Sequence, residues 1–120
     1  MSDLAETHDG QLTALFRFAP DFAGFQGHFP GRPVLPAVCS IQLVVTMLEA
    51  WSGGKVGLSE IIAARFNAPI GCDEELKLLC SLTFLDEQQA RVKATIERDG
   101  ETVSKLKLAL TIGRRERLGE

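Results

Sequence analysis

The chain has 120 residues, 45% of them hydrophobic and 24% charged, and its net charge is −3. This length predicts one globular domain with a core of its own. A mildly acidic chain without a basic block argues against a nucleic-acid groove or an anionic-membrane surface. Three cysteines without a Cys-x-x-Cys pair argue against disulfides or zinc and favour a reducing compartment. No signal segment or bilayer-spanning run is visible, so we expect a cytoplasmic protein.

The chain divides into three expected parts. Residues 1–10 are polar and predict a flexible N-terminal arm, residues 11–113 a single domain, and residues 114–120 a polar C-terminal tail. The domain begins with a predicted strand over residues 11–18, because its apolar residues alternate: Leu12, Ala14, Phe16 and Phe18. Residues 20–36 follow as a connection rich in Gly, Pro and Phe. A loop of this length in a small domain is usually functional.

A helix is predicted over residues 37–52. Pro36 suits its first turn, and Gly53-Gly54 suits its end. Apolar residues surround almost the whole circumference, which predicts a helix buried on most sides. One polar stripe remains, spaced i, i+4 and i+7: Gln42, Thr46 and Glu49.

After this helix the apolar pattern changes to period two. Four strands are predicted, over residues 56–67, 75–85, 90–96 and 106–112. Asp99-Gly100 is a hairpin turn signal between the last two. One long helix followed by a meander of strands predicts an α+β fold, with a curled antiparallel sheet wrapped around the buried helix.

Residues 27–36 read GHFPGRPVLP and could carry chemistry. The prolines stiffen this stretch, and its glycines permit close backbone approach around His28. Such a loop could deliver the imidazole as a general base to the start of the helix. The first amides of a helix lack intrahelical partners, so the Ala37 amide could polarise a carbonyl oxygen. A base beside such an amide suits proton abstraction α to a carbonyl.

These residues resemble the signature of the 3-hydroxyacyl-acyl-carrier-protein dehydratases, bacterial fatty-acid enzymes with the hotdog fold. The resemblance begins with GHFPGRPVLP and the polar residue at Gln42. It continues through the stretch ARFNAPIGCD, residues 64–73, and the strand pair joined by Asp99-Gly100. It covers roughly residues 11–112.

The resemblance implies a specific site. The histidine matching His28 would remove the Cα proton of a 3-hydroxyacyl thioester, the Ala37 amide would hold the thioester carbonyl, and water would leave to give a trans-2-enoyl thioester. The site would lie between two subunits of a homodimer or dimer-based oligomer, without a metal or organic cofactor. The carrier would be acyl carrier protein or coenzyme A. The substrate-contacting residues would be Phe29, Gly31, Pro36, Ala37, Val38 and Thr46.

The sequence departs from this family at two positions. Gln42 stands where the family has an acidic residue that assists departure of the hydroxyl, and Ala37 stands where it has glycine. A glutamine amide cannot supply a proton at neutral pH. Glu49 lies about 10 Å further along the helix axis, which is too far for the same role. Glu60 cannot be placed from sequence, and Cys39 in so apolar a helix is best explained by packing.

Three functions remain open from sequence. The first is a 3-hydroxyacyl-thioester dehydratase that uses His28, with Gln42 orienting the hydroxyl or a water. The second is a non-catalytic acyl-thioester-binding or partner subunit that pairs with a complete dehydratase. The third and weakest is a thioesterase on the same fold. The intact His28 loop favours the first, whereas Gln42 and Ala37 favour the second.

Overall fold

The computed structural model describes residues 2–7, 10–18, 37–71 and 73–113. These residues form one helix and a single six-stranded sheet. The elements in chain order are β1 (Ser2–Glu6), β2 (Leu12–Phe16), α1 (Ala37–Ser52), β3 (Val56–Phe66), β4 (Leu76–Phe84), β5 (Gln89–Arg98) and β6 (Glu101–Ile112). No helix among the described residues is long and apolar enough to span a bilayer.

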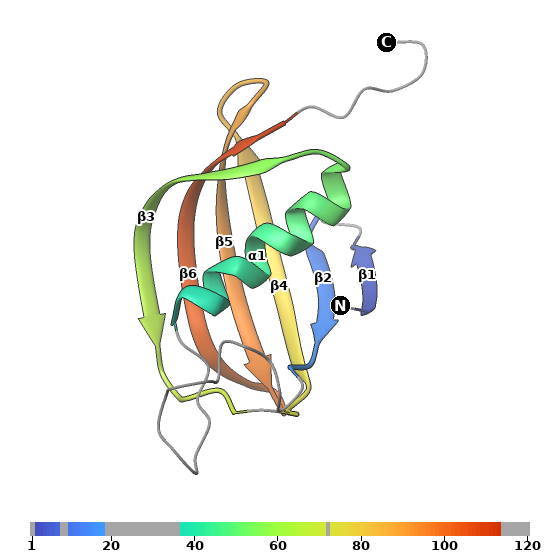
Figure 1. The fold of residues 1–120 in the computed structure, drawn as a ribbon, viewed down its shortest axis with the longest axis vertical. Helices are drawn as coiled ribbons and strands as arrows, with labels where there is room; N and C mark the ends of the chain where they lie inside the picture. The colour runs from blue at the N-terminus through green and yellow to red at the C-terminus, as the bar shows by residue number, and fades with distance from the viewer. Residues whose placement is uncertain (1, 8–9, 19–36, 72, 114–120) are drawn as a thin grey trace.

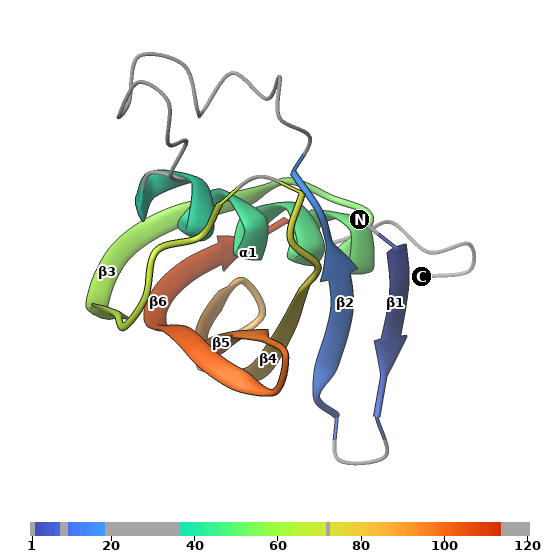
Figure 2. The same cartoon turned by 90° about the horizontal axis from the view of Figure 1, so that it is seen from below.

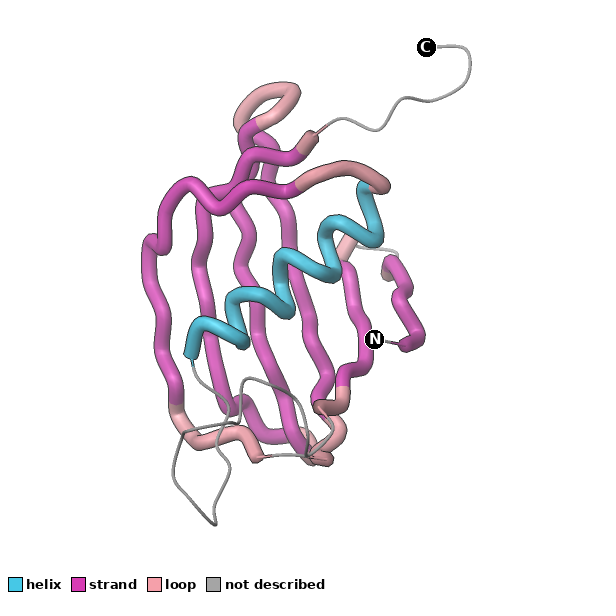
Figure 3. The backbone as a smooth tube through the Cα atoms, in the orientation of Figure 1, coloured by secondary structure: helices cyan, strands magenta, loops and turns pink. Residues whose placement is uncertain are grey.

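The sheet is antiparallel and curls around α1. Its strands lie in the order β1-β2-β4-β5-β6-β3, and every neighbouring pair is antiparallel. The helix runs obliquely across one face of the sheet, as Figure 1 and the tube in Figure 3 show. Viewed along the sheet in Figure 2, β3, β6, β5 and β4 curve around the helix. This arrangement confirms the predicted α+β class, with one helix inside a curled antiparallel sheet.

Strand alternation places one apolar face of the sheet against the helix. In β5, for example, Ala90, Val92, Ala94 and Ile96 are all buried, whereas the residues between them are exposed or half-buried. The same alternation in β2, β4 and β6 builds one continuous core with α1. The core includes fully buried residues from each of these elements: Leu12, Met47, Leu48, Leu78, Val92 and Leu108.

The helix is buried or half-buried around most of its circumference and leaves one exposed stripe. Its bounds agree with the predicted residues 37–52, and the buried side consists of Ser40, Leu43, Val44, Met47 and Leu48. Val38, by contrast, is 68% exposed, and Gln42 and Thr46 are exposed as well. The expectation of burial on most sides is confirmed, because four partly buried residues also pack against the core: Cys39, Ile41, Val45 and Trp51.

The N-terminal residues correct an expectation. Residues 1–10 were expected to form a flexible arm, but Ser2–Glu6 forms strand β1, which pairs with β2. Gly10, at φ 79°, helps to reverse the chain between the two strands, and the amide of Gly10 donates to the Thr7 carbonyl at 3.0 Å. β1 is an edge strand, so one side of its backbone pairs with β2 while its side chains can remain polar.

The strand order also differs from a simple meander. Strands β4, β5 and β6 are consecutive neighbours, but β3 pairs with β6 at the far edge of the sheet rather than with β4. The helix lies between β2 and β3 in the chain and crosses the sheet, so it carries the chain to the opposite edge (Figure 1). At the β5–β6 turn, Asp99 and Gly100 both have positive φ, 52° and 81°. The hairpin predicted from this dipeptide is confirmed, since two-residue hairpin turns with two positive φ angles favour Asp-Gly.

Close backbone packing at Gly54 predicts a local sensitivity. A Cβ atom at Gly54 would lie 2.7 Å from the carbonyl oxygen of Gly113, and the Gly113 amide donates to the Lys55 carbonyl at 2.6 Å. We expect Gly54→Ala to lower the free energy of unfolding by about 1–3 kcal/mol, because backbone atoms must shift. Gly57→Ala is the matched control, since its nearest contact would be the Thr111 oxygen at 4.0 Å. Denaturant unfolding measures the free energy of unfolding of both variants, and equal values for the two would contradict this prediction.

Candidate functional site

A hollow of about 320 Å³ lies where α1 begins. One wall is the start of the helix, and the other is the chain that leaves β3. The lining residues are Ala37, Ser40, Phe66, Asn67, Ala68, Pro69, Ile70 and Ser104. Residues 66–70 belong to the second stretch that carries the dehydratase resemblance, so the structure brings two separate parts of that resemblance to one place.

The polar groups around this hollow could bind the oxygen of a carbonyl or hydroxyl group. Ala37 is the first residue of α1, and the amides of a first helical turn have no intrahelical acceptor. Such amides also carry partial positive charge, which favours an oxygen that gains negative charge. No acidic side chain lies in the first turn of α1 to compete for them.

Ser104 adds an unsatisfied hydroxyl to the same hollow. Its side chain is 1% exposed, and its Oγ has no hydrogen-bond partner among the described residues. In β6 it pairs in register with Phe66 on one side and Ile96 on the other, so it interrupts an apolar row. A buried hydroxyl without a partner costs about 1–3 kcal/mol. A polar ligand atom or a water in the hollow would recover this cost.

The structure brings together some of the predicted site residues and separates others. Ala37 lines the hollow, whereas Val38, Gln42 and Thr46 do not. Gln42 and Thr46 lie on the exposed side of α1, where the Gln42 Nε2 donates to the Thr46 Oγ1 at 3.5 Å. The remaining predictions fall outside the described residues: His28, Phe29, Gly31 and Pro36.

The alternative reactive side chains on α1 have structural explanations. The Glu49 carboxylate accepts a hydrogen bond from the Val56 amide at 3.3 Å, which ties the end of the helix to the start of β3. Cys39 packs against the core, and partial burial raises the pKa of its thiol. Cys39 therefore has the packing role that the sequence predicted, and Glu49 has a structural role at the end of the helix. Glu60 lies exposed on β3 and does not line the hollow.

Cys80 is also a core residue rather than a nucleophile. It is fully buried in β4, and desolvation raises the pKa of its thiol to about 12. A thiol must ionise to attack, so this side chain stays unreactive at neutral pH. Within the described ranges, no three His, Cys, Asp or Glu side chains lie close enough together to hold a metal ion.

Sequence reasoning missed Ser40, Asn67 and Ser104 as parts of this site. Ser40 was assigned to an apolar helix, and Asn67 to the end of a strand. Ser104 left a visible signal, because it is a polar residue two positions before Leu106 on the strand face that continues with Leu108 and Leu110. A serine that falls on the buried face of a strand indicates that a polar group is needed at that place in the core.

Known proteins resemble this chain over most of its length. A family model described as "ApeI-like: ApeI dehydratase" matches residues 4–107. A 3-hydroxyacyl-[acyl-carrier-protein] dehydratase FabZ from Bacillus pumilus is 32% identical over 96 residues, which cover 74% of this chain and 67% of that protein. These matches confirm the resemblance that the His28 loop and residues 64–73 suggested.

Solved structures confirm the hotdog fold. The dehydratase heterocomplex ApeI:P from Xenorhabdus doucetiae contains a chain with TM-score 0.66 and 23% identity, covering 84% of this chain and 87% of that one. A 1,4-dihydroxy-2-naphthoyl-CoA thioesterase from Synechocystis has TM-score 0.69 and 13% identity, covering 89% and 85%. At these identities the likeness concerns the fold alone.

Proposed function

Because the chain belongs to the ApeI-like dehydratase family, we propose that it is a cytoplasmic 3-hydroxyacyl-thioester dehydratase of fatty-acid or related lipid or polyketide metabolism. Its substrate is an acyl thioester on acyl carrier protein or coenzyme A, and its product is the trans-2-enoyl thioester. The observation that carries the proposal is the hollow at the start of α1, where the Ala37 end of the helix meets residues 66–70 and the Ser104 hydroxyl.

The proposed chemistry needs one base and one oxygen-binding group. The His28 imidazole takes the Cα proton while the Ala37 amide polarises the thioester carbonyl, which stabilises the negative charge that develops on its oxygen. The C3–O bond then breaks, and the hydroxyl leaves as water with the proton that His28 holds. Gln42 orients the hydroxyl or a water but supplies no proton. Phe29, Gly31, Pro36, Val38 and Thr46 contact the rest of the substrate.

A second function is favoured by one specific observation. The resemblance matches Gln42 to the family's acid, and the Gln42 amide donates only one long hydrogen bond among the described residues, to Thr46 at 3.5 Å. A chain that lacks this acid could bind the acyl thioester as a partner subunit beside a complete dehydratase. A thioesterase on the same fold is the third and weakest candidate.

The deciding experiment is a turnover assay with 3-hydroxyacyl thioesters of several chain lengths, on both carriers. Formation of the enoyl thioester, followed by its ultraviolet absorbance, supports the dehydratase. Saturable thioester binding without enoyl formation supports the partner-subunit function. Release of free thiol without enoyl formation supports the thioesterase.

We also propose that β3 joins two subunits into one sheet. It is an edge strand with one buried residue, Val56, and it exposes three large apolar side chains: Leu58 (42%), Ile61 (47%) and Phe66 (44%). A long apolar edge strand attracts other chains unless it is covered. Pairing with β3 of a second copy would cover it and would place the exposed side of α1 near the interface.

This assembly gives a testable prediction. We expect a dimer or a dimer-based oligomer by light scattering at micromolar concentration, and we expect Ile61→Lys to shift it toward monomer, because an edge lysine blocks strand pairing. Leu85→Lys is the matched control, since Leu85 is 57% exposed in the turn between β4 and β5. A native monomer at that concentration would exclude both the dimer and a site shared between subunits.

A further inference from the structure

A β-bulge in β6 lies beside the buried Ser104 hydroxyl. Ile96 and Glu97 are consecutive in β5, but their partners in β6, Ser104 and Thr102, are two positions apart. Val103 therefore has no partner in β5, and Val103 and Ser104 are both 1% exposed although they are neighbours in the strand. Bulges redirect side chains and are frequent next to active sites. The backbone of β6 therefore departs from regular pairing at the point where it carries a polar side chain into the core.

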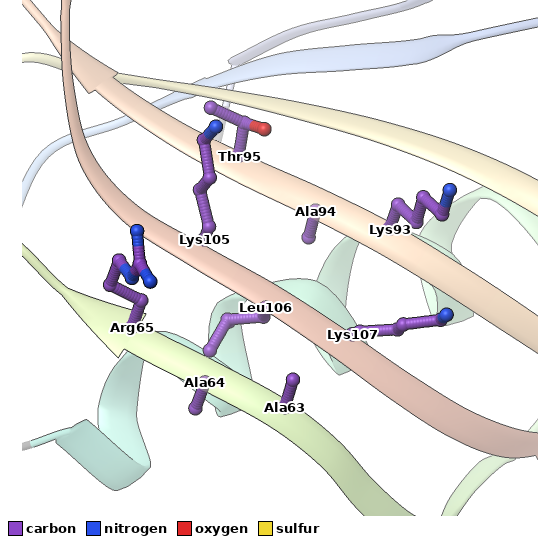
Figure 4. A pocket seen from close by; sticks show the side chains of 9 residues that line it. All are labelled: Ala63, Ala64, Arg65, Lys93, Ala94, Thr95, Lys105, Leu106 and Lys107. Atoms are coloured by element: carbon purple, nitrogen blue, oxygen red, sulfur yellow. The ribbon is translucent and has the colours of Figure 1, made fainter.

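Ser104 belongs to the face of the sheet that α1 covers. The next residue, Lys105, is exposed and projects from β6 beside Arg65 of β3 on the other face (Figure 4). Since neighbouring residues of a strand point to opposite faces, Ser104 points toward the helix. It lines the hollow at the start of α1 together with Ala37, the first residue of the helix. The Ser104 hydroxyl and the first helical amide therefore border the same space.

Hydrogen bonds fix the opposite wall of this hollow. The Val103 carbonyl, at the bulge, accepts from the Asn67 and Ala68 amides at 2.8 and 3.3 Å. The Arg98 guanidinium donates to the Pro69 carbonyl at 2.8 Å. Asn67, Ala68 and Pro69 all line the hollow. A wall held in this way keeps its distance from the Ser104 hydroxyl, which is the preorganisation that a binding site requires.

The chemistry of the hollow selects a neutral oxygen that accepts two hydrogen bonds. None of the described residues that line it is charged, so a permanent anion buried there would lack a counter-charge. The Ser104 Oγ has no partner among the described residues, and the first amides of α1 have no intrahelical acceptor. An amide N–H only donates, whereas a hydroxyl can donate or accept. A carbonyl oxygen has two lone pairs and satisfies both donors at once.

We propose that the Ser104 hydroxyl is a catalytic group, the second donor to the thioester carbonyl oxygen beside the Ala37 amide. The identity of the ligand rests on the proposed function, whereas the need for an acceptor rests on the buried hydroxyl itself. When His28 takes the Cα proton, the electron pair of the C–H bond moves toward the carbonyl and leaves negative charge on its oxygen. Both donors hold this charge until the C3–O bond breaks and the pair forms the C2–C3 double bond. Ser104 keeps its proton throughout.

Steady-state kinetics of Ser104→Ala test the second donor. With a 3-hydroxyacyl thioester, kcat should fall about 10²-fold, the usual effect of losing one donor to a developing oxyanion. KM should change by no more than about threefold, because the hydrogen bond strengthens as the charge develops. The thermal unfolding midpoint should stay equal or rise, since alanine removes a buried hydroxyl that lacks a partner. Ser81→Ala is the matched control, because Ser81 is exposed on β4 and does not line the hollow. An unchanged kcat, or an equal loss in Ser81→Ala, would overturn the proposal.

Proton exchange identifies the oxygen that Ser104 holds. A saturated acyl thioester has the carbonyl but no 3-hydroxyl, and removal of its Cα proton in D2O introduces deuterium that mass spectrometry detects. Ser104→Ala should slow this exchange by about the same factor as dehydration, because both reactions place negative charge on the same oxygen. Exchange at the native rate, with dehydration alone impaired, would mean that Ser104 binds the leaving hydroxyl and would overturn the proposal.

A binding measurement keeps the test independent of turnover. If the native protein converts no thioester, the dehydratase function fails, but the hydrogen bond from Ser104 to a carbonyl oxygen can still be measured. The ligands are a saturated acyl-pantetheine thioester and its thioether analogue, which lacks the carbonyl oxygen, and calorimetry gives both affinities. Ser104→Ala should weaken thioester binding about threefold or more and leave thioether binding unchanged. Unchanged thioester affinity, or equal losses for the two ligands, would overturn the proposal.

Discussion

Replacing His28 with alanine is expected to lower dehydratase turnover by a factor of about 10² to 10⁴ while leaving the fold intact. The imidazole is the only group in our proposal that removes the Cα proton. The Ala37 N–H cannot replace it, because a backbone N–H donates a hydrogen bond and cannot accept a proton. The prolines and glycines of residues 27–36, rather than the ring, are expected to hold the loop. The measurement is kcat with a 3-hydroxyacyl thioester, together with the thermal unfolding midpoint.

The other histidine of the chain gives a matched control. His8→Ala removes an imidazole of the same size from a position with no proposed chemistry, so its turnover should equal that of the native protein. Turnover in His28→Ala that equals the His8→Ala value would show that the base is elsewhere. The role carried over from the family would then be wrong at its central residue.

Local signals in the sequence predict most of the fold. The bounds of α1 are right because proline before a helix and two glycines after it act within one turn. The β5–β6 turn is right because Asp99-Gly100 tolerates positive φ at both positions. β1 was missed because its polar residues pair through backbone alone, which leaves no apolar period to detect. The place of β3 at the far edge is a long-range property that no local pattern encodes.

The candidate site was predictable only where residues near in sequence act together. Ala37 was found because a helix start is readable from sequence. Ser104 was missed because its importance arises from a hollow that β3, β6 and α1 form jointly. Gln42 and Ala37 were expected in one site shared between two subunits, and within the single chain only Ala37 lines the hollow. In the proposed dimer Gln42 would reach the substrate of the other subunit, and no pattern within one chain describes such a contact.

The second large effect is expected from Gln42→Glu, which should raise turnover on 3-hydroxyacyl thioesters by about tenfold or more if the native protein is a dehydratase that lacks its acid. Glutamate and glutamine have nearly equal volume, and Gln42 is exposed on α1, so the change should cost little packing. The resemblance implies that, in the proposed dimer, the new carboxyl would lie opposite the His28 imidazole of the other subunit and beside the apolar acyl chain of the substrate. Desolvation there raises the pKa of a carboxyl, and a protonated imidazole lowers it. A net rise would leave protonated acid near neutral pH to assist the leaving hydroxyl.

The rate of hydration and dehydration across pH, for native protein and variant, tests this prediction. Gln89→Glu is the matched control, because Gln89 is an exposed glutamine at the start of β5 and has no proposed part in the site. A gain in Gln42→Glu alone would show that the missing proton limits the native rate. A native rate near 10 s⁻¹ that falls on substitution would mean that Gln42 is itself an adapted catalytic group. If neither the native protein nor Gln42→Glu converts the thioester but both bind it, the chain is the acyl-binding partner of a complete dehydratase. An added acid cannot restore a reaction when the other groups that the reaction needs are missing.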